Sequence, residues 1–192
     1  MNFLAHLYLS GNDDELKIGN FIGDAVKGRD LSEYSPRVQD GIRLHRGIDR
    51  YTDTHPIVLK SKLRLRPKYH KYAPVIVDMF YDHFLASLWA DYSKVPLEAF
   101  IHSCHDLLNS QKDMMPNHAQ YILPYMIEGQ WLLGYRELSG LDCSLTGMSE
   151  RSSFKSNMEH ATADLEKDYE SYRQEFQSFF PDLEKFVRTF TH

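Results

Sequence analysis

The sequence predicts an all-α protein that folds as a single-domain helical bundle. Apolar residues recur three and four positions apart over most of the chain, whereas no stretch alternates apolar and polar residues for more than a few positions. The 192 residues are enough for one hydrophobic core and too few for two domains of ordinary size. Hydrophobic residues make up 42% of the chain and charged residues 26%, which is the composition of a globular protein.

Turn and helix-breaking residues divide the first half of the chain into segments. The apolar residues 3–9 lead into a turn at residues 10–12, and Gly28 is placed to stop the helix that follows the turn. Pro36 and Pro56 each lie where the first turn of a helix tolerates proline. The expected helices cover residues 13–26, 35–54, 56–65 and 75–92, and the last of them is apolar enough to be central in the core.

The second half of the chain continues the helical pattern with one exception. Residues 134–153 contain Gly140 and Gly147 and are expected to be irregular. Pro124 is expected to kink its helix, and Pro181 to begin the terminal helix. The expected helices cover residues 96–110, 119–135, 156–180 and 181–190.

Charge and composition exclude several classes of function. The net charge is −5, which disfavours a general nucleic-acid binder. The N-terminus lacks the basic start of a signal peptide, and no apolar run is long enough to span a bilayer. The two cysteines, Cys104 and Cys143, form neither a disulfide framework nor a zinc motif. We therefore expect a cytoplasmic protein without a membrane or nucleic-acid partner, and the sequence carries no signal for an oligomeric state.

Basic residues are concentrated in one part of this acidic chain. Residues 27–71 contain twelve Lys and Arg against five Asp and Glu, whereas residues 137–192 contain eleven acidic and six basic residues. Such a segment favours a local patch for an anionic partner. The alternative is a set of solvated helix faces whose charges do not converge.

Carboxylates and a histidine interrupt the apolar helical segments at Asp24, Asp78, Asp82 and His83. Burying a carboxylate without a partner costs several kcal/mol or shifts its pKa strongly. A divalent cation compensates several carboxylates at once, and we favour this explanation for the adjacent Asp82 and His83. For Asp78 alone we favour a buried carboxylate bonded to Arg, Tyr or helix N–H groups.

A second pair of potential ligands lies on the helix expected over residues 35–54. His45 and Asp49 are four positions apart, so their directions differ by about 40° and both side chains reach one point. Asp53 continues the same stripe. The alternative is an exposed ion pair of little energetic consequence. Together with Asp24 and the Asp82–His83 pair, however, these residues come from three helices, which suits a cation site in the core of a bundle.

Two other histidine motifs point less clearly to a metal. His105-Asp106 is a literal His-Asp dipeptide, with His102 three residues earlier, but its segment has the composition of a surface helix. His6 lies alone in an apolar stretch, where a hydrogen-bonded core histidine is the common case. The chain contains no G-x-S-x-G elbow, phosphate-binding loop, dinucleotide fingerprint or E-x-x-H pair.

Motifs spread over nearly the whole chain, and densest in residues 1–90, carry a resemblance to a known family. They are Met1-Asn2-Phe3-Leu4-Ala5-His6-Leu7, Gly19-Asn20-Phe21-Ile22-Gly23-Asp24 followed by Gly28, Gly41-Ile42-Arg43-Leu44-His45-Arg46-Gly47-Ile48-Asp49 with Thr52-Asp53, Asp82-His83-Phe84-Leu85, Gln130-Trp131-Leu132 and Gly147-Met148. In these motifs the chain resembles the bacterial acyl-carrier-protein phosphodiesterases, a divergent branch of the HD phosphohydrolases.

The resemblance implies an HD-phosphohydrolase-like helical fold and removal of the 4′-phosphopantetheine arm from holo acyl carrier protein, which regenerates the apo form. It implies a divalent metal, typically Mn²⁺, with Mg²⁺ or Fe²⁺ as alternatives. The Asp82-His83 pair reverses the usual His-Asp order of the wider group. Mapped onto this chain, the implied metal ligands are His6, Asp24, His45, Asp49, Asp82 and His83.

This hypothesis assigns further roles along the chain. Hydrolysis is metal-assisted, and Asp24 and Asp82 are the expected catalytic residues. The basic segment between Lys60 and Lys71 is expected to dock the acidic holo acyl carrier protein. The side chains expected to contact phosphate are Lys27, Arg46 and Arg50.

Two other functions stay open from the sequence. An HD-like phosphohydrolase would act on a nucleotide or another small phosphodiester. A non-catalytic helical binding module would use the histidine and carboxylate cluster only to support its structure.

Overall fold

The computed structural model describes residues 1–190, which form helices joined by turns and loops, with no strand among them. The predicted all-α fold class is therefore confirmed. The first half contains α1 Phe3–Leu9, α2 Asp14–Ile22, α3 Pro36–Thr54, α4 Pro56–Tyr69, the 3₁₀ turn η1 His70–Tyr72, α5 Ala73–Ser87 and α6 Trp89–Tyr92. The second half contains α7 Leu97–Ser110, η2 Lys112–Met114, α8 Asn117–Glu128, α9 Trp131–Gly134, α10 Leu138–Glu150, η3 Met158–His160, α11 Ala161–Lys167 and α12 Tyr169–Phe190.

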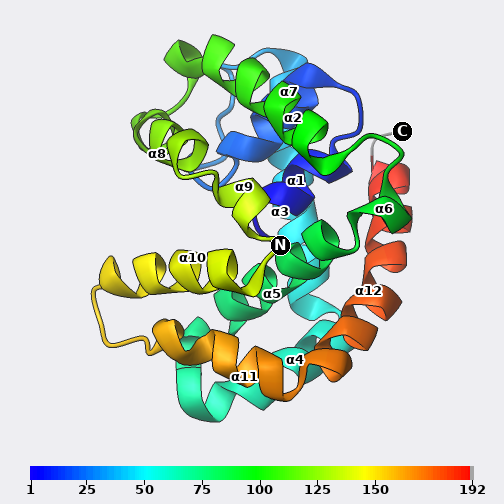
Figure 1. The fold of residues 1–192 in the computed structure, drawn as a ribbon. Coiled ribbons are helices and arrows are strands. Elements are labelled where there is room, and N and C mark those ends of the chain that lie inside the picture. Colours follow the sequence, from blue (N-terminus) through cyan, green and yellow to red (C-terminus); the bar gives the residue numbers. More distant parts are fainter. Residues whose placement is uncertain (191–192) are drawn as a thin grey trace.

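The helices gather around the N-terminus, which lies in the middle of the molecule (Figure 1). On one side of it lie α1 and α2 with α7, α8 and α9, on the other lie α4, α5, α10 and α11, and α3 runs from the first group to the second. The long helix α12 runs along the edge of the molecule and packs on α3, α4 and α5. The first residues of the chain are thus surrounded by both groups of helices.

The core is built on α5, as its apolar sequence predicts. Phe80 and Phe84 are fully buried, and the aromatic stripe of α12 packs across them. Phe84 stacks on Phe176 with ring centroids 6.0 Å apart, and Tyr172 meets Phe80 edge to face at 5.2 Å. These contacts bury large apolar surfaces, which is the main driving force for folding.

Two glycines allow α2 and α3 to touch along their backbones. A Cβ on Gly19 would lie 2.1 Å from the Val38 carbonyl oxygen, and a Cβ on Gly41 would lie 2.4 Å from that of Leu16. No larger residue fits at either position without separating the helices. This close approach places Asn20, beside Gly19, next to the α3 turn that begins after Gly41.

The structure corrects several of the expected element boundaries. Residues 3–9 form α1 rather than only an apolar lead-in, and α2 ends at Ile22 rather than at residue 26. The helix expected over residues 119–135 contains Pro124 within α8 and breaks at Gly129–Gln130, where Gln130 adopts a left-handed backbone with φ 48°. α4 runs beyond residue 65 to Tyr69, and the core helix over 75–92 ends at Ser87 before the short α6.

Two larger expectations for the second half were wrong. Residues 134–153 are not irregular, because Leu141 and Leu145 are fully buried and hold α10 in place. The helix expected over residues 156–180 divides at Asp168, and Pro181 lies inside α12 rather than at its start. Burial of flanking residues such as Phe180 and Leu183 outweighs the hydrogen bond that proline cannot donate.

Within residues 1–190, no helix combines the length and the apolar character that a bilayer crossing requires.

Candidate metal centre

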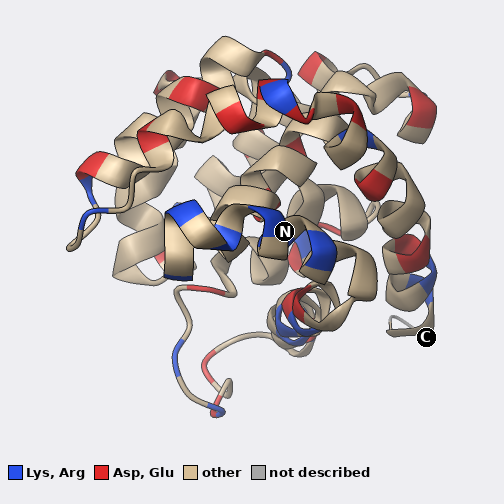
Figure 2. Ribbon diagram, turned by 90° about the horizontal axis from the view of Figure 1, so that it is seen from below, with Lys and Arg blue, Asp and Glu red and all other residues tan. Residues whose placement is uncertain are grey.

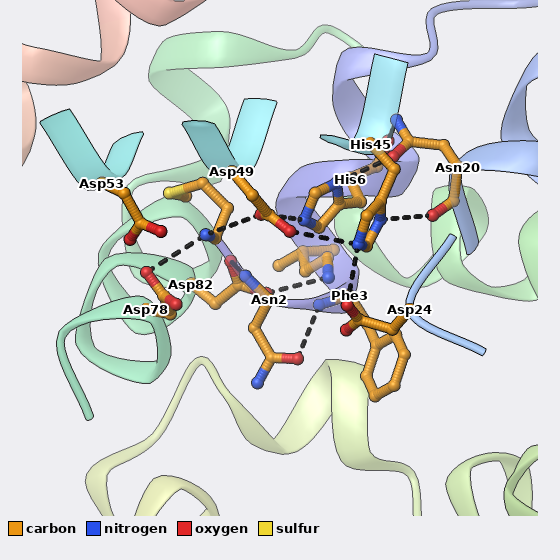
Figure 3. A network of polar contacts seen from close by, with 12 residues as sticks. Asn2, Phe3, His6, Asn20, Asp24, His45, Asp49, Asp53, Asp78 and Asp82 are labelled. Atoms are coloured by element: carbon orange, nitrogen blue, oxygen red, sulfur yellow. Dashed lines mark hydrogen bonds and ion pairs between the residues drawn. The ribbon is translucent and has the colours of Figure 1, made fainter. Parts of the chain in front are cut away.

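Three side chains from two helices converge beside the N-terminus (Figure 3). His6 comes from α1, whereas His45 and Asp49 come from successive turns of α3. The Nε2 atom of His6 lies 3.2 Å from one Asp49 oxygen, and the Nε2 atom of His45 lies 3.2 Å from the other. One ligand atom from each residue lies within 4.8 Å of the other two, and no second such group occurs in residues 1–190.

Asn20 of α2 fixes the orientation of both imidazole rings. The Nδ1 atom of His6 donates to the Asn20 side-chain oxygen at 2.7 Å, and the Nδ1 atom of His45 donates to the Asn20 backbone oxygen at 2.8 Å. The Asn20 amide nitrogen donates to the His6 carbonyl and to Ser10 Oγ, so its oxygen must face the His6 ring. With each Nδ1 atom occupied as a donor, each neutral ring presents the lone pair of Nε2.

Both Nε2 atoms are buried polar atoms without a hydrogen bond. The two rings stack with centroids 4.0 Å apart and an interplanar angle of 18°, which places both lone pairs on the same side. Carboxylate oxygens face them at 3.1 to 3.2 Å. A nitrogen lone pair and a carboxylate oxygen that face each other repel. This arrangement therefore requires either a proton or a cation between each Nε2 atom and the carboxylates.

Asp24 completes the mouth of the centre. It follows the end of α2, and its Oδ1 atom lies 3.1 Å from His45 Nε2. The preceding Gly23 packs directly on the His45 ring, where a Cβ would lie 2.3 Å from the ring carbon Cγ. The Asp24 side chain is 81% exposed, against 37% for Asp49, so Asp24 is the most solvent-exposed member of the group.

The two histidines of the centre differ in the direction of their pKa shifts. Burial and the neighbouring His45 lower the pKa of His6. Burial disfavours the charged form of His45, but ion pairing with Asp24 and Asp49 outweighs it and raises the pKa of His45 to about 9. The pKa of Asp49 is well below its usual range despite burial, because both histidines and the N-terminal amine face it. Without metal, one proton is therefore shared between His45 and the carboxylates at neutral pH.

The N-terminal amine forms an unexpected part of this network. It lies 3.1 Å from Asp78 Oδ1 and 3.6 Å from Asp49 Oδ1, so it contacts both carboxylates. Burial disfavours its charge, yet Asp78 and Asp49 together raise the pKa of this amine. Asp78 thus has a polar partner rather than a metal, as the sequence favoured, but this partner is the N-terminal amine and not the expected Arg, Tyr or helix N–H group. The amine itself was missed, because sequence patterns describe side chains only.

Asp82 and His83 lie outside the cluster that the sequence predicted them to join. The fully buried Asp82 carboxylate accepts the backbone N–H groups of Asn2 at 3.2 Å and Leu4 at 2.8 Å, and so caps the start of α1. Burial raises its pKa to about 7. His83 hydrogen-bonds the Tyr135 carbonyl through Nδ1 and the Tyr169 hydroxyl through Nε2, which leaves neither nitrogen for a metal.

Two of the three expected phosphate contacts lie beside the mouth of the centre. Lys27 donates to the Asp24 carbonyl at 2.9 Å, and Arg46 donates to the Val26 carbonyl at 3.0 Å. Both cations therefore border the loop that carries the Asp24 carboxylate. Arg50 is exposed and directly follows Asp49 on α3.

The other sequence candidates lie elsewhere. Asp53 binds Lys62 at 2.6 Å, one turn beyond the centre. His102 and Asp106 form an exposed pair at 3.5 Å on α7, and His105 does not join a group of potential ligands within the described chain. The surface-helix interpretation of the His105-Asp106 dipeptide is consistent with this placement.

The donor atoms at the centre fit a divalent cation. Two imidazole nitrogens with one or two carboxylates suit Mn²⁺, Fe²⁺ or Zn²⁺, whereas Mg²⁺ and Ca²⁺ prefer oxygen ligands. The hydrogen bonds to Nδ1 supply the outer support that metal-binding histidines commonly have. His6, His45 and Asp49 would hold the ion, with Asp24 completing the set from the solvent side.

Comparison with known proteins points to one family. A family model described as acyl carrier protein phosphodiesterase matches residues 1–183. An acyl carrier protein phosphodiesterase of Photorhabdus laumondii is 34% identical over 184 residues, which cover 94% of this chain and 92% of the relative. Proteins of the same name from Enterobacter sp. strain 638 and Yersinia enterocolitica are 34% and 32% identical, with 95% of each chain covered. No solved structure matches the chain significantly.

Proposed function

The chain belongs to the acyl carrier protein phosphodiesterase family, and from this premise we propose that it hydrolyses the bond between 4′-phosphopantetheine and the serine of holo acyl carrier protein. The reaction depends on a divalent metal, Mn²⁺ or Fe²⁺ by its ligand set. The observation that carries this proposal is the pair of buried Nε2 atoms, aimed without hydrogen bonds at the Asp49 carboxylate.

The protein's own residues supply the positions and charges for this reaction. A bound divalent ion would supply Lewis-acid polarisation of the phosphoryl group and activation of the attacking water. Asp24 faces solvent in its ionised form, since His45 lowers its pKa, and it orients water at the mouth. Lys27 and Arg46 place positive charge beside the same loop, where it offsets the charge of the phosphoryl oxygens.

Asp82 takes no part in the chemistry of this proposal. Its oxygens hold the backbone of α1, and its carboxylate is fully buried. It acts as a positioning residue because α1 carries His6 into the centre. The same reasoning leaves His83 out of the ligand set, since both of its nitrogens are engaged.

The carrier protein docks on a basic patch, which comprises Lys62, Arg66, His70 and Lys71 with the exposed Leu59 and Leu63. These residues border one hollow next to Asp53, one turn of α3 from the metal ligand Asp49. Figure 2 shows Lys and Arg gathered in the middle of that view, around the N-terminus, and Asp and Glu mainly on the outer helices. Exposed leucines among cations suit an acidic, amphipathic partner helix.

Only part of the predicted basic segment is available for docking. Lys60 and Arg64 pair with Glu175, Lys62 pairs with Asp53, and Lys68 pairs with Asp164. Arg66 and Lys71 make no ion pair with a carboxylate of the described chain, so their charges remain for a partner. Arg66 and Lys71 are therefore the cations we assign to the carrier protein.

The function is tested by incubating purified protein with holo acyl carrier protein in the presence of Mn²⁺ or of excess chelator. We expect conversion to the apo form, seen as a mobility shift in native gels, and release of 4′-phosphopantetheine by mass spectrometry. Chelator should abolish both. An intact holo substrate in the presence of Mn²⁺ would contradict the proposal, and hydrolysis that persists in chelator would remove its metal requirement.

A further inference from the structure

A large groove adjoins the metal centre and has no role in the reaction described so far. Its volume is about 650 Å³, within the range of small-molecule sites. The start of α1, the first half of α5, and α8, α9 and α10 surround it. Most of its lining is apolar, with a few polar side chains such as Asn2, Gln130 and Ser144.

The groove begins at the wall of the metal centre. Asn2 and Phe3 line it, and the backbone of Asn2 is held by Asp82 while the Phe3 ring packs on Phe21 at 5.4 Å. Phe21 lies two residues before Gly23, which contacts the ring of His45. Figure 3 shows the Asn2 and Phe3 side chains on the Asp24 side of the centre, away from α3. A molecule whose phosphate lies at the centre can therefore extend past Phe3 into this groove.

One face of α10 forms the far wall. Gly140, Cys143, Ser144, Gly147 and Met148 all line the groove at helical spacing. Gly140 packs on the backbone of Gly134, whereas Cys143, Ser144 and Gly147 are small side chains that leave space along this face of α10. The exposed thiol of Cys143 is part of this lining.

The opposite wall carries an unusual backbone. Gln130 lines the groove with φ 48°, a left-handed conformation that costs about 1 kcal/mol or more for a non-glycine residue. This turn separates α8 from α9 and aims Trp131 into the lining. The two motifs Gln130-Trp131-Leu132 and Gly147-Met148, which the metal centre leaves unexplained, thus meet across one space.

We propose that this groove binds the 4′-phosphopantetheine arm of the substrate, with its phosphate at the metal centre and its thiol end along α10. The inference rests on the proposed function. The arm is covalently attached to the phosphate, so it must leave the centre along an adjoining surface. Its branched apolar end and two amides match a lining of aromatic and aliphatic side chains with few hydrogen-bonding groups.

The hollow bordered by the basic patch is also lined by Ala73 and Pro74, at the start of α5. The groove is lined at the same place by Tyr72 and Val75, so the two sites lie on different sides of the start of α5. Carrier protein and arm therefore approach from different sides.

Cys143 tests the proposal in the native protein. Cys104 is buried, so iodoacetamide is expected to alkylate Cys143 first, with the site identified by peptide mass spectrometry. With Mn²⁺ and S-methyl-4′-phosphopantetheine, whose blocked thiol cannot consume iodoacetamide, at tenfold its dissociation constant, alkylation should slow by about tenfold, since about 90% of the groove is occupied. Inorganic phosphate, which reaches only the metal centre, should leave the rate unchanged. Equal rates with saturating S-methyl-4′-phosphopantetheine would overturn the inference.

A groove-filling variant provides the second measurement. Ser144→Trp should raise KM for holo acyl carrier protein by about tenfold or more, the loss expected when a binding subsite is blocked. Its Mn²⁺ affinity and its hydrolysis of bis(4-nitrophenyl) phosphate, a diester without an arm, should match the wild type. Glu150→Trp, on an exposed face of the same helix, is the matched control and should be neutral.

The two proposals fail in different ways. Wild-type protein that leaves holo acyl carrier protein intact contradicts the proposed function, whatever the groove binds. Wild-type protein that hydrolyses it while Ser144→Trp keeps the same KM and Cys143 stays unprotected contradicts only the groove. Protection of Cys143 together with a selective rise in KM supports the inference.

Discussion

Replacing Asp49 by asparagine removes the one carboxylate that both histidines of the metal centre share. In the metal-free protein this carboxylate lies 3.2 Å from each Nε2 atom and 3.6 Å from the N-terminal amine. An amide of the same size keeps the shape of the site but provides no negative charge for a cation. We therefore expect Asp49→Asn to remain folded and to lose most of its affinity for Mn²⁺.

The magnitude follows from binding linkage. Mn²⁺ at a hundredfold its dissociation constant stabilises the folded state by about 2.7 kcal/mol. For a chain of this length each kcal/mol raises Tm by about 2–4 °C, so the wild type should gain about 5–11 °C. Loss of a direct ligand should weaken binding by about a hundredfold or more, beyond the usual effect of an outer residue. The same Mn²⁺ concentration then contributes at most about 0.4 kcal/mol, or about 1–2 °C.

The assay is thermal unfolding by circular dichroism, with and without Mn²⁺, after dialysis against chelator. Asp53→Asn is the matched control, because Asp53 lies one turn further on α3 and pairs with Lys62 instead. It should respond to Mn²⁺ as the wild type does. An Asp49→Asn protein that gains as much in Tm from Mn²⁺ as the wild type would refute the assignment of Asp49 as a ligand.

Four further predictions follow from the same geometry. Asn20→Ala should lower Mn²⁺ affinity by about 10–100-fold in calorimetry, because one imidazole loses its Nδ1 partner; unchanged affinity would show that the hydrogen bond is dispensable. Asp82→Ala should lower the free energy of unfolding in urea by about 1–3 kcal/mol, since buried N–H groups of Asn2 and Leu4 lose their acceptor, and a neutral effect would count against this role. The pKa of His45 is raised from 6.5 to about 9, so Mn²⁺ must displace the proton of His45 in order to bind. The affinity for Mn²⁺ should therefore rise by about tenfold per pH unit between pH 6.5 and 8.5 and level off above about pH 9. A Mn²⁺ affinity that does not change with pH would contradict this. In the metal-free protein the same proton stabilises the fold fully below pH 6.5, and this contribution is lost as the pH rises through about 9. Charge reversal of both Arg66 and Lys71 should raise KM for holo carrier protein and weaken the dependence of this KM on salt. Charge reversal of Lys68, which is already paired with Asp164, should have a smaller effect. Equal effects on KM would remove the docking assignment.

Helical periodicity and cap residues predicted the elements that are held by local interactions. Ser35 and Pro36 begin α3, and His55-Pro56 ends it, where the sequence indicated. The errors fall where tertiary contacts override local propensity. Pro181 continues α12 because its neighbours are buried, and α10 tolerates Gly140 because that residue packs on the backbone of Gly134.

The candidate site was predictable in part. His45 and Asp49 share one helix, so their spacing alone indicated a common target. The convergence of His6 with them depends on how α1 packs, which spacing does not describe. Asp82 was chosen because a buried carboxylate needs compensation, but backbone N–H groups of α1 provide it instead of a metal. Asn20 is likewise a polar residue in an apolar helix. Its need for hydrogen-bond partners could have indicated that it supports the site, but this signal was overlooked.

The most direct measurement is X-ray diffraction at the manganese absorption edge from crystals grown with Mn²⁺. The account predicts an anomalous peak about 2.0–2.2 Å from His6 Nε2, His45 Nε2 and an Asp49 oxygen, the usual range for such ligands. A peak at His102 and His105, or no ordered ion near Asp49 in crystals of active protein, would contradict it.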